Sequence, residues 1–266
     1  MAVKLLCASL SLLMEFASPQ RAEQETNVRA AFEKMAAEVK AFDPTLIITF
    51  GPDHFNGFFY DLMPSFCVGI RATAAGDWNY GAENNKINVP EETALNLVRR
   101  VLDEGVDVAY SYRMQADHGV TQPLHFLCDG QLDRYPTIPV FINGAAAPMP
   151  TTKRTVALGR AIGQFIKSLN LENERVLILG TGGLSHDPPT PQMGSVPPEV
   201  EEFLIAGRNP STEARHARQA KIIAVGQKLE AGDTSVAVPL NAAWDIALLV
   251  HFKNADFSDI EAMTKA

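Results

Sequence analysis

Three histidines in this sequence each follow a predicted strand within a few residues. The pairs of strand and histidine are 45–50 with His54, 106–111 with His118, and 175–179 with His186. In an open α/β sheet, loops that leave different strands at their carboxyl ends converge on one ligand pocket. Imidazoles titrate near neutral pH, so they can exchange protons, bind substrate oxygens or hold metals. The spacing therefore predicts one functional site that contains all three side chains.

The surroundings of these histidines favour a site over a structural role. They stand in loops that contain glycine or proline, "GPDHFNGFF", "QADHGVTQP" and "GGLSHDPP". One such histidine could simply bond a backbone carbonyl, but three at one sheet edge are better explained by a shared pocket. The other histidines, His125, His216 and His251, fall within or at the ends of predicted helices. We expect these three side chains to lie at the surface or to pack against neighbouring residues.

The stretch "GTGGLS" at residues 180–185 resembles a phosphate-binding loop. Neither GxGxxG nor GxxxxGK[ST] is present, however, and proline rather than a helix follows. We expect its glycines to turn the backbone and deliver His186. A Ser185 nucleophile with His186 as its base is a weaker alternative, because adjacent side chains seldom face one another and the GxSxG motif is absent.

Strands alternate with helices along most of the chain. Predicted strands cover 3–9, 45–50, 106–111, 138–142 and 175–179, and predicted helices cover 19–42, 90–102, 151–169, 198–206, 211–230 and 241–252. This order predicts a single α/β domain, residues 1–266, with a mostly parallel sheet flanked by helices. The part from about 198 to 266 is expected to be helical.

Composition narrows the class of protein. The chain has 266 residues, of which 46% are hydrophobic and 20% are charged, as in ordinary globular proteins. Its formal net charge of -8 opposes binding to a phosphate backbone, so we expect no nucleic-acid partner. Three cysteines without CxxC spacing indicate neither a disulfide framework nor a zinc site. A cytoplasmic location fits best.

The apolar run "LLCASLSLLM" at residues 5–14 could be read as an export signal. It has one preceding lysine, ends at Glu15 and lacks an A-x-A cleavage site. It is also shorter than the ~20 residues that a membrane helix needs. We therefore predict a buried first strand with Leu10 at its carboxyl end, and no membrane partner.

Four stretches resemble the type II extradiol dioxygenases, the superfamily of protocatechuate 4,5-dioxygenase. They are "PDHFNGFFYDLMPSFCVG", "SYRMQADHGVTQPL", "PVFINGAAAPMP" and "LGTGGLSHDPP". The resemblance implies the α/β fold of that superfamily, assembly into a homo-oligomer and a small aromatic, catechol-like substrate. It also implies Fe(II) bound by two histidines and a carboxylate, with two further histidines as base and acid.

Some residues with these roles in the superfamily have a matching residue in this chain, and others do not. His118 in "ADHG" and His186 in "GLSH" match the acid-base pair, and His54 in "PDHFNG" matches one iron ligand. The positions that match the other two ligands hold Leu10 and Ala243, which cannot bind a metal. We therefore expect no metal cofactor, with Fe2+ as the alternative. The substrate pocket is expected to include His54, Asp53, Asn56, Leu10 and Ala243.

These residues lead to a metal-independent, non-oxidative enzyme as the first hypothesis. His118 would act as base and His186 as acid on a phenolic or vinylogous diketone substrate, each contributing roughly 10²- to 10⁴-fold in rate. Hydrolysis of a carbon–carbon bond fits best, with tautomerisation or hydration next. One alternative is an Fe(II) extradiol dioxygenase for a 3-substituted catechol, with the ligands misaligned. Another is a non-catalytic subunit of a heteromeric dioxygenase.

Overall fold

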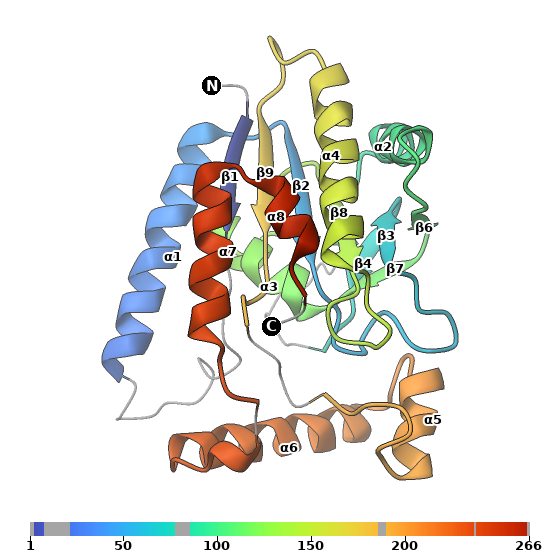
Figure 1. Ribbon diagram of the computed structural model, residues 1–266, viewed down its shortest axis with the longest axis vertical. Coiled ribbons are helices and arrows are strands. Elements are labelled where there is room, and N and C mark those ends of the chain that lie inside the picture. The colour runs from blue at the N-terminus through green and yellow to red at the C-terminus, as the bar shows by residue number, and fades with distance from the viewer. Residues whose placement is uncertain (1–2, 8–21, 78–85, 186–189, 237, 265–266) are drawn as a thin grey trace.

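A six-stranded sheet forms the centre of the computed structural model, which describes residues 3–7, 22–77, 86–185, 190–236 and 238–264 (Figure 1). Its strands, in spatial order, are β1 (Val3–Cys7), β9 (Val176–Gly180), β2 (Leu46–Gly51), β8 (Thr137–Ile142), β3 (Phe66–Gly69) and β6 (Ala109–Ser111). A second sheet holds β5 (Lys86–Ile87), β4 (Ala72–Ala74) and β7 (Met114–Ala116). The mostly parallel sheet predicted from the sequence is confirmed.

The strands of the main sheet do not all run the same way. β1, β9, β2 and β8 are parallel, whereas β3 is antiparallel to β8, and β6 is parallel to β3. The predicted strand 106–111 is therefore shorter than expected and runs opposite to β2 and β9. Its carboxyl end lies at the other edge of the sheet. The chain returns through β7, which pairs with β4, before it reaches His118.

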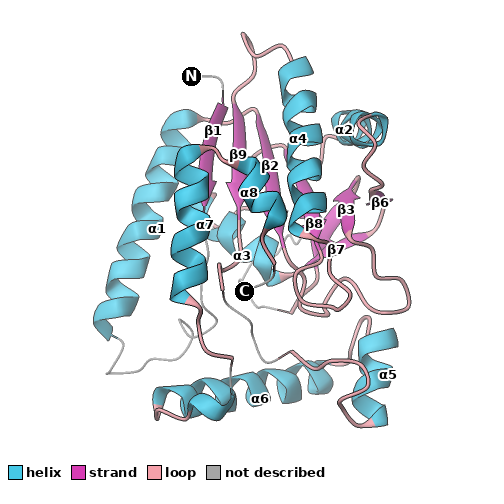
Figure 2. Cartoon of the chain, in the orientation of Figure 1, coloured by secondary structure: helices cyan, strands magenta, loops and turns pink. Residues whose placement is uncertain are grey.

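Helices cover both faces of the sheet (Figure 2). The helices, in chain order, are α1 (Ala22–Phe42), α2 (Glu91–Asp103), α3 (His118–Leu127), α4 (Thr152–Ser168), α5 (Pro198–Ala206), α6 (Thr212–Glu230), α7 (Ala242–Asn254) and α8 (Phe257–Ala262). Of these, α5 and α6 lie beyond the end of the strands and not on a face of the sheet (Figure 2). A 3-10 turn, η3, covers Thr234–Val236. Helices α5 to α8 lie in the part of the chain, from about 198 on, for which the sequence predicts helical structure. The sequence predicted no bounds for α3, although His125 was expected in or at the end of a helix, and it did not predict α8.

The two faces of β2 show why these residues form a central strand. Leu46 and Ile48 pack in one core with α2 and α4, whereas Ile47 points the other way and packs with α1 and α3. Successive side chains of a strand point to opposite faces, so a continuous apolar run suits a strand covered on both sides. Ile48 has no exposed surface.

The C-terminal helices pack against distant parts of the chain. The backbone N–H groups of Tyr60 and Asp61 donate to the carbonyls of Leu204 and Ile205 in α5 (2.8 and 3.1 Å). At the other end, the hydroxyl of Thr152 in α4 donates to the Met263 carbonyl just after α8 (2.7 Å). The helical part is therefore joined both to the sheet layer and to the loop that follows β2.

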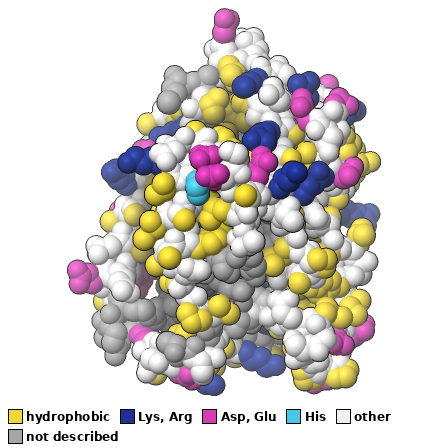
Figure 3. Space-filling model, viewed as in Figure 1, with side chains coloured by type: hydrophobic (Ala, Val, Ile, Leu, Met, Phe, Trp, Pro, Cys, Tyr) yellow, Lys and Arg dark blue, Asp and Glu magenta, His cyan; other side chains and the backbone are white. Residues whose placement is uncertain are grey.

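Helix α7 leaves much apolar surface exposed. Leu248 is buried, but Ile246, Leu249 and Phe252 are 62%, 51% and 52% exposed. Hydrophobic side chains gather on the face of the molecule that carries this helix (Figure 3). Despite this, no helix within the described residues is both long enough and apolar enough to span a bilayer.

Replacement of Ile48 by alanine tests the central position of β2. We expect Ile48→Ala to lower the free energy of unfolding by roughly 2–5 kcal/mol, because the side chain is fully buried and a cavity would remain. Leu62→Ala is the control: Leu62 is 77% exposed and should change stability by less than ~0.5 kcal/mol. Denaturant unfolding measures both. Equal effects would contradict the assigned core.

Candidate active site

Asp53 organises the loop that carries His54. The chain leaves β2 at Gly51, and the buried Asp53 carboxylate accepts backbone N–H groups from Asn56, Gly57 and Phe58 (3.1, 2.8 and 3.2 Å). A short acidic side chain commonly fixes a turn in this way. The structure thus gives Asp53 a role in holding the loop, and its contact with substrate stays a prediction.

Phe55 lies in a strained backbone conformation next to His54. Its φ is 56°, in the left-handed region that costs a non-glycine residue roughly 1–2 kcal/mol. The side chain is buried and packs with Phe59 and Leu204, and its carbonyl accepts a hydrogen bond from Arg218 of α6 (3.0 Å). These contacts from the C-terminal helices hold the chain in the turn that presents His54.

His118 reaches the same place from the second sheet. β7 leads into Asp117, the N-cap of α3, whose Oδ1 accepts the backbone N–H of Gly119 (2.5 Å). His118 is thus the first residue of α3, not part of a loop directly after strand 106–111 as the sequence suggested. The predicted convergence of His54 and His118 is nevertheless present.

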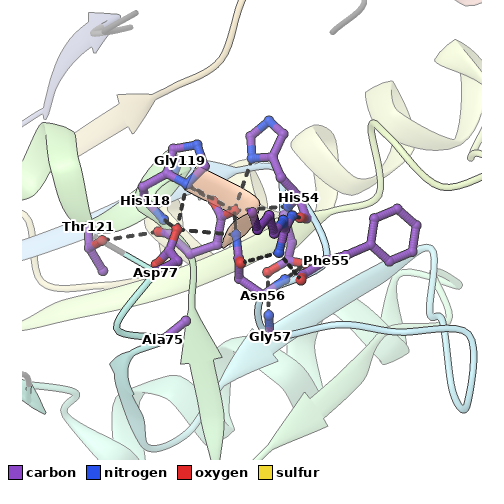
Figure 4. A network of polar contacts seen from close by, with 12 residues as sticks. His54, Phe55, Asn56, Gly57, Ala75, Asp77, His118, Gly119 and Thr121 are labelled. Carbon is purple, nitrogen blue, oxygen red and sulfur yellow. Dashed lines mark hydrogen bonds and ion pairs between the residues drawn. The ribbon is translucent and has the colours of Figure 1, made fainter. Parts of the chain in front are cut away.

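The two imidazoles stack, and each has a carboxylate at its Nδ1 (Figure 4). Their ring centroids are 4.7 Å apart with an interplanar angle of 14°. His54 Nδ1 lies 3.0 Å from Asp117 Oδ2, and His118 Nδ1 lies 2.5 Å from Asp77 Oδ2. Carboxylates at Nδ1 fix the tautomer and the orientation of both rings.

Asn56 links the carboxylate that bonds His54 to the carboxylate that bonds His118. Its amide nitrogen donates to Asp117 Oδ2 (2.9 Å) and to Asp77 Oδ2 (3.2 Å), while its Oδ1 accepts from Arg218 (2.9 Å). The side chain predicted to bind substrate is therefore bonded on both its amide nitrogen and its amide oxygen within the protein. Binding of substrate by Asn56 stays a prediction.

Burial and mutual charge change the pKa values of this cluster. Burial raises the pKa of Asp53 to about 7, and the neighbouring Asp117 carboxylate adds to the rise. Burial alone would also raise the pKa of Asp117, but the imidazoles of His118 and His54 outweigh it and hold that pKa well below its usual range. Asp117 is therefore an anion at neutral pH.

His118 responds in the opposite sense. Burial would lower the pKa of its imidazole, but the carboxylates around it, Asp117, Asp77 and Asp53, together raise that pKa to about 9. At neutral pH the ring is therefore an imidazolium. This form suits His118 to donate a proton, whereas the sequence suggested that it accepts one.

The donor set fits a divalent metal such as iron. His54, Asp117 and His118 each offer a ligand atom, and these atoms lie within 4.8 Å of one another. Two imidazoles and a carboxylate are the ligands of non-haem Fe(II) sites, and metal-bound histidines commonly have a carboxylate behind them. Asp77 Oδ1 is also buried with no hydrogen-bond partner among the described residues. The cluster therefore retains capacity for another bound group.

Within that set, His54 is the best metal ligand. A metal binds a neutral imidazole, so it would have to displace the proton that the carboxylates hold on His118. The Asp117 oxygens already accept the His54 ring and backbone N–H groups and the Gly119 N–H. Asp117 already orients the His54 ring, so a metal bound by its carboxylate would share that oxygen with these hydrogen bonds.

The first turn of α3 and two loops lie close to Pro52, two residues before His54. A side chain at Gly119, Gly144 or Gly182 would begin 3.2 to 3.9 Å from this proline. Gly144 follows β8 and Gly182 follows β9, so the loops after parallel strands do meet at one edge of the sheet. Gly182 has a φ of +102°, which a residue with a side chain rarely adopts.

The loop after β9 is fastened to α7. The Ser185 backbone N–H and hydroxyl donate to the two carboxylate oxygens of Asp245 (2.7 and 2.9 Å), and Ser185 Oγ accepts the Asn241 backbone N–H (2.8 Å). Ser185 is therefore bound in a structural clasp, which weakens the alternative of a Ser185 nucleophile. Ala243 lies in the exposed first turn of the same helix.

Two predicted site residues, His186 and Leu10, lie outside the described residues. Their roles stay predictions. Conversely, sequence reasoning missed Asp77, Asp117 and Arg218. Asp117 stands beside His118 in "ADHG", and its acidic type next to a histidine was the one signal available for it. The sequence indicates that the loop "GDWNYGAENN", residues 76–85, lines or covers the pocket, but nothing singled out Asp77 within it, and nothing linked Arg218 to the site.

Comparison with known proteins places this geometry in a family. Residues 9–266 match the family described as the catalytic LigB subunit of aromatic ring-opening dioxygenase. A 2,3-dihydroxyphenylpropionate/2,3-dihydroxicinnamic acid 1,2-dioxygenase of Photorhabdus laumondii is 56% identical over 265 residues, which cover 100% of this chain and 81% of that protein. Proteins of the same name from Azotobacter vinelandii and Paraburkholderia xenovorans are 47% and 45% identical over 97% and 99% of this chain, and 81% of each relative is covered.

These findings correct the functional hypothesis. The expectation of a metal-independent hydrolase without a cofactor is wrong, because the relatives are named as dioxygenases and the histidine cluster fits a metal. The expectation rested on Leu10 and Ala243. Leu10 lies outside the described residues, and Ala243 lies on an exposed helical turn. The resemblance to extradiol dioxygenases is confirmed. The chain belongs to the LigB family of aromatic ring-opening dioxygenases.

Proposed function

We propose that this chain is an Fe(II)-dependent extradiol dioxygenase that opens the ring of a 3-substituted catechol with an acidic side chain. The observation that carries the proposal is the stacked pair His54 and His118, each with a buried carboxylate at Nδ1. The names of the relatives, which state a dihydroxyphenyl acid as substrate, support the substrate class. Both atoms of dioxygen would enter the product as the ring bond beside the hydroxyls breaks.

The protein side chains would act around the metal. Iron held there would supply a Lewis acid for the reaction of the catechol with dioxygen. His54 is the ligand that Asp117 orients. His118 holds a proton at Nε2 for transfer to the opening ring, because its carboxylate neighbours stabilise the imidazolium. The resemblance implies that His118 and His186 form an acid-base pair; with His118 as the acid, His186 would take the catechol proton.

Removal of His54 tests the metal assignment. We expect His54→Ala to lose most bound iron and to lower oxygen uptake with a catechol more than about 100-fold, because an oriented imidazole ligand disappears. Metal analysis and an oxygen electrode measure the two effects on protein loaded with Fe(II) without oxygen. His216→Ala, in an exposed position of α6, is the matched control.

The same assay examines position 10. Leu10→His should raise iron affinity above that of the wild type if this position faces the metal, as the resemblance implies. An iron-loaded wild type without oxygen uptake, or uptake that survives a strong chelator, would contradict the proposed function.

Replacement of Asp77 tests the role of His118 as proton donor. The Asp77 carboxylate raises the pKa of His118, so Asp77→Asn should lower it, and the proton should be lost at lower pH. We expect the basic limb of the kcat/KM profile to move down by about one pH unit or more. Asp103→Asn, an exposed residue of α2, should leave the profile in place. An unmoved basic limb in Asp77→Asn would show that His118 does not supply the proton.

We also propose a homo-oligomer located in the cytoplasm. The exposed apolar side chains of α7 support assembly. Cys67 and Cys128 are both buried free thiols, which suits a reducing compartment. In analytical ultracentrifugation we expect a mass that is a multiple of 29.0 kDa. A single species at the monomer mass across micromolar concentrations would refute the assembly.

A further inference from the structure

Helix α6 presents two arginines to the loops of the site. It lies across the end of the molecule toward which β9 and β2 point (Figure 1). Arg215 and Arg218 stand three residues apart, so they share one face of the helix. Both are partly buried, whereas the neighbours on either side of each are exposed.

Arg218 makes three hydrogen bonds to the loop that carries His54. Its guanidinium donates to the carbonyls of His54 and Phe55 and to Asn56 Oδ1, and it lies 5.1 Å above the ring of Phe203. Burial lowers the pKa of this side chain. These contacts fix Arg218 as part of the scaffold that holds the His54 loop.

Arg215 is bound much more loosely. Its Nη1 donates to the Ala75 carbonyl (3.1 Å), and the guanidinium lies over Gly76, 3.6 to 4.0 Å from where a Cβ would stand. Among the described residues, no carboxylate oxygen lies within 4.0 Å of its nitrogens. A guanidinium has five N–H donors, so most of them are not used in the described contacts.

The position of Arg215 over Gly76 matters because the residue that follows Gly76 in the sequence is part of the histidine cluster. Gly76 precedes Asp77, whose carboxylate bonds His118. Consecutive Cα atoms are about 3.8 Å apart, so the guanidinium lies within a few residue lengths of the imidazole pair. A three-carbon side chain on a catechol ring spans a gap of this order.

The charges around the imidazoles also favour a binding role for Arg215. The carboxylates Asp53, Asp77 and Asp117 surround the imidazoles, and they would repel a substrate that carries its own carboxylate. A cation with unused donors at the edge of this cluster offsets that repulsion. Arginine binds a carboxylate through two parallel N–H···O bonds, which also fixes its direction.

We propose that Arg215 binds the side-chain carboxylate of the aromatic substrate and so selects catechols with an acidic 3-substituent over neutral ones. The inference rests on the proposed function and extends it, because it names the residue that distinguishes between substrates of the same ring chemistry. Arg215 acts on binding, whereas the His54 and His118 pair acts on the ring.

Two matched substrates test this role. 2,3-Dihydroxyphenylpropionate and 3-propylcatechol share the ring and the three-carbon chain and differ in the carboxylate. We expect Arg215→Met to lower the ratio of kcat/KM, acid over neutral, roughly 10- to 100-fold, mainly through a higher KM for the acid. Arg215→Lys should restore part of the ratio. Lys221→Met, which removes the same charge from an exposed position of α6, should leave the ratio unchanged.

The outcomes separate the two proposals. Turnover of both catechols with an unchanged ratio in Arg215→Met would overturn the role of Arg215 and leave the proposed function standing. A loss of the ratio in Lys221→Met as large as in Arg215→Met would also overturn it, since general charge would then explain the effect. A wild type that, loaded with Fe(II), cleaves neither catechol would overturn the proposed function and this inference together.

Discussion

Asp117 is fully buried and remains ionised, and the rest of the site is arranged around that charge. An isolated carboxylate without solvent is very unfavourable, so it persists only with several hydrogen bonds and positive charge nearby. Its oxygens accept the His54 ring and backbone, the Asn56 amide and the Gly119 N–H at the start of α3. Through these bonds one anion orients an imidazole, caps a helix and joins two loops.

The topology explains how those groups meet. β2 delivers His54 directly, but β6 runs the other way, so the chain needs the short strand β7 to bring Asp117 and His118 back to the same edge. The second sheet, although small, thus sets the position of half of the site. Asp77 comes from the segment after β4, the neighbour of β7, and this pairing brings its carboxylate to His118.

Sequence patterns predicted the parts of this arrangement that depend on local order. Most strands of the main sheet stand out as short apolar runs and the long helices as apolar stripes. The convergence of His54 and His118 was also predicted, but the expected route holds only for His54: the strand 106–111 ends at the other edge of the sheet, and β7 brings the chain back to His118. Asp77 and Arg218 could not be found this way, because they lie 41 and 164 residues from the histidines they contact. β4, β5 and β7 have two or three residues each and are too short to show a period. The metal-free hypothesis failed because two aligned positions say little about which other side chains the fold brings near a metal.

The clasp between Ser185 and Asp245 has a consequence for how the molecule opens. It joins the loop after β9 to the first turn of α7, and the chain beyond α8 is in turn bonded to α4. Elements joined in this way tend to unfold together as one cooperative unit. Opening of α7 would therefore release the residue directly before His186. The opening of the C-terminal helices and the release of Ser185 then share a single equilibrium.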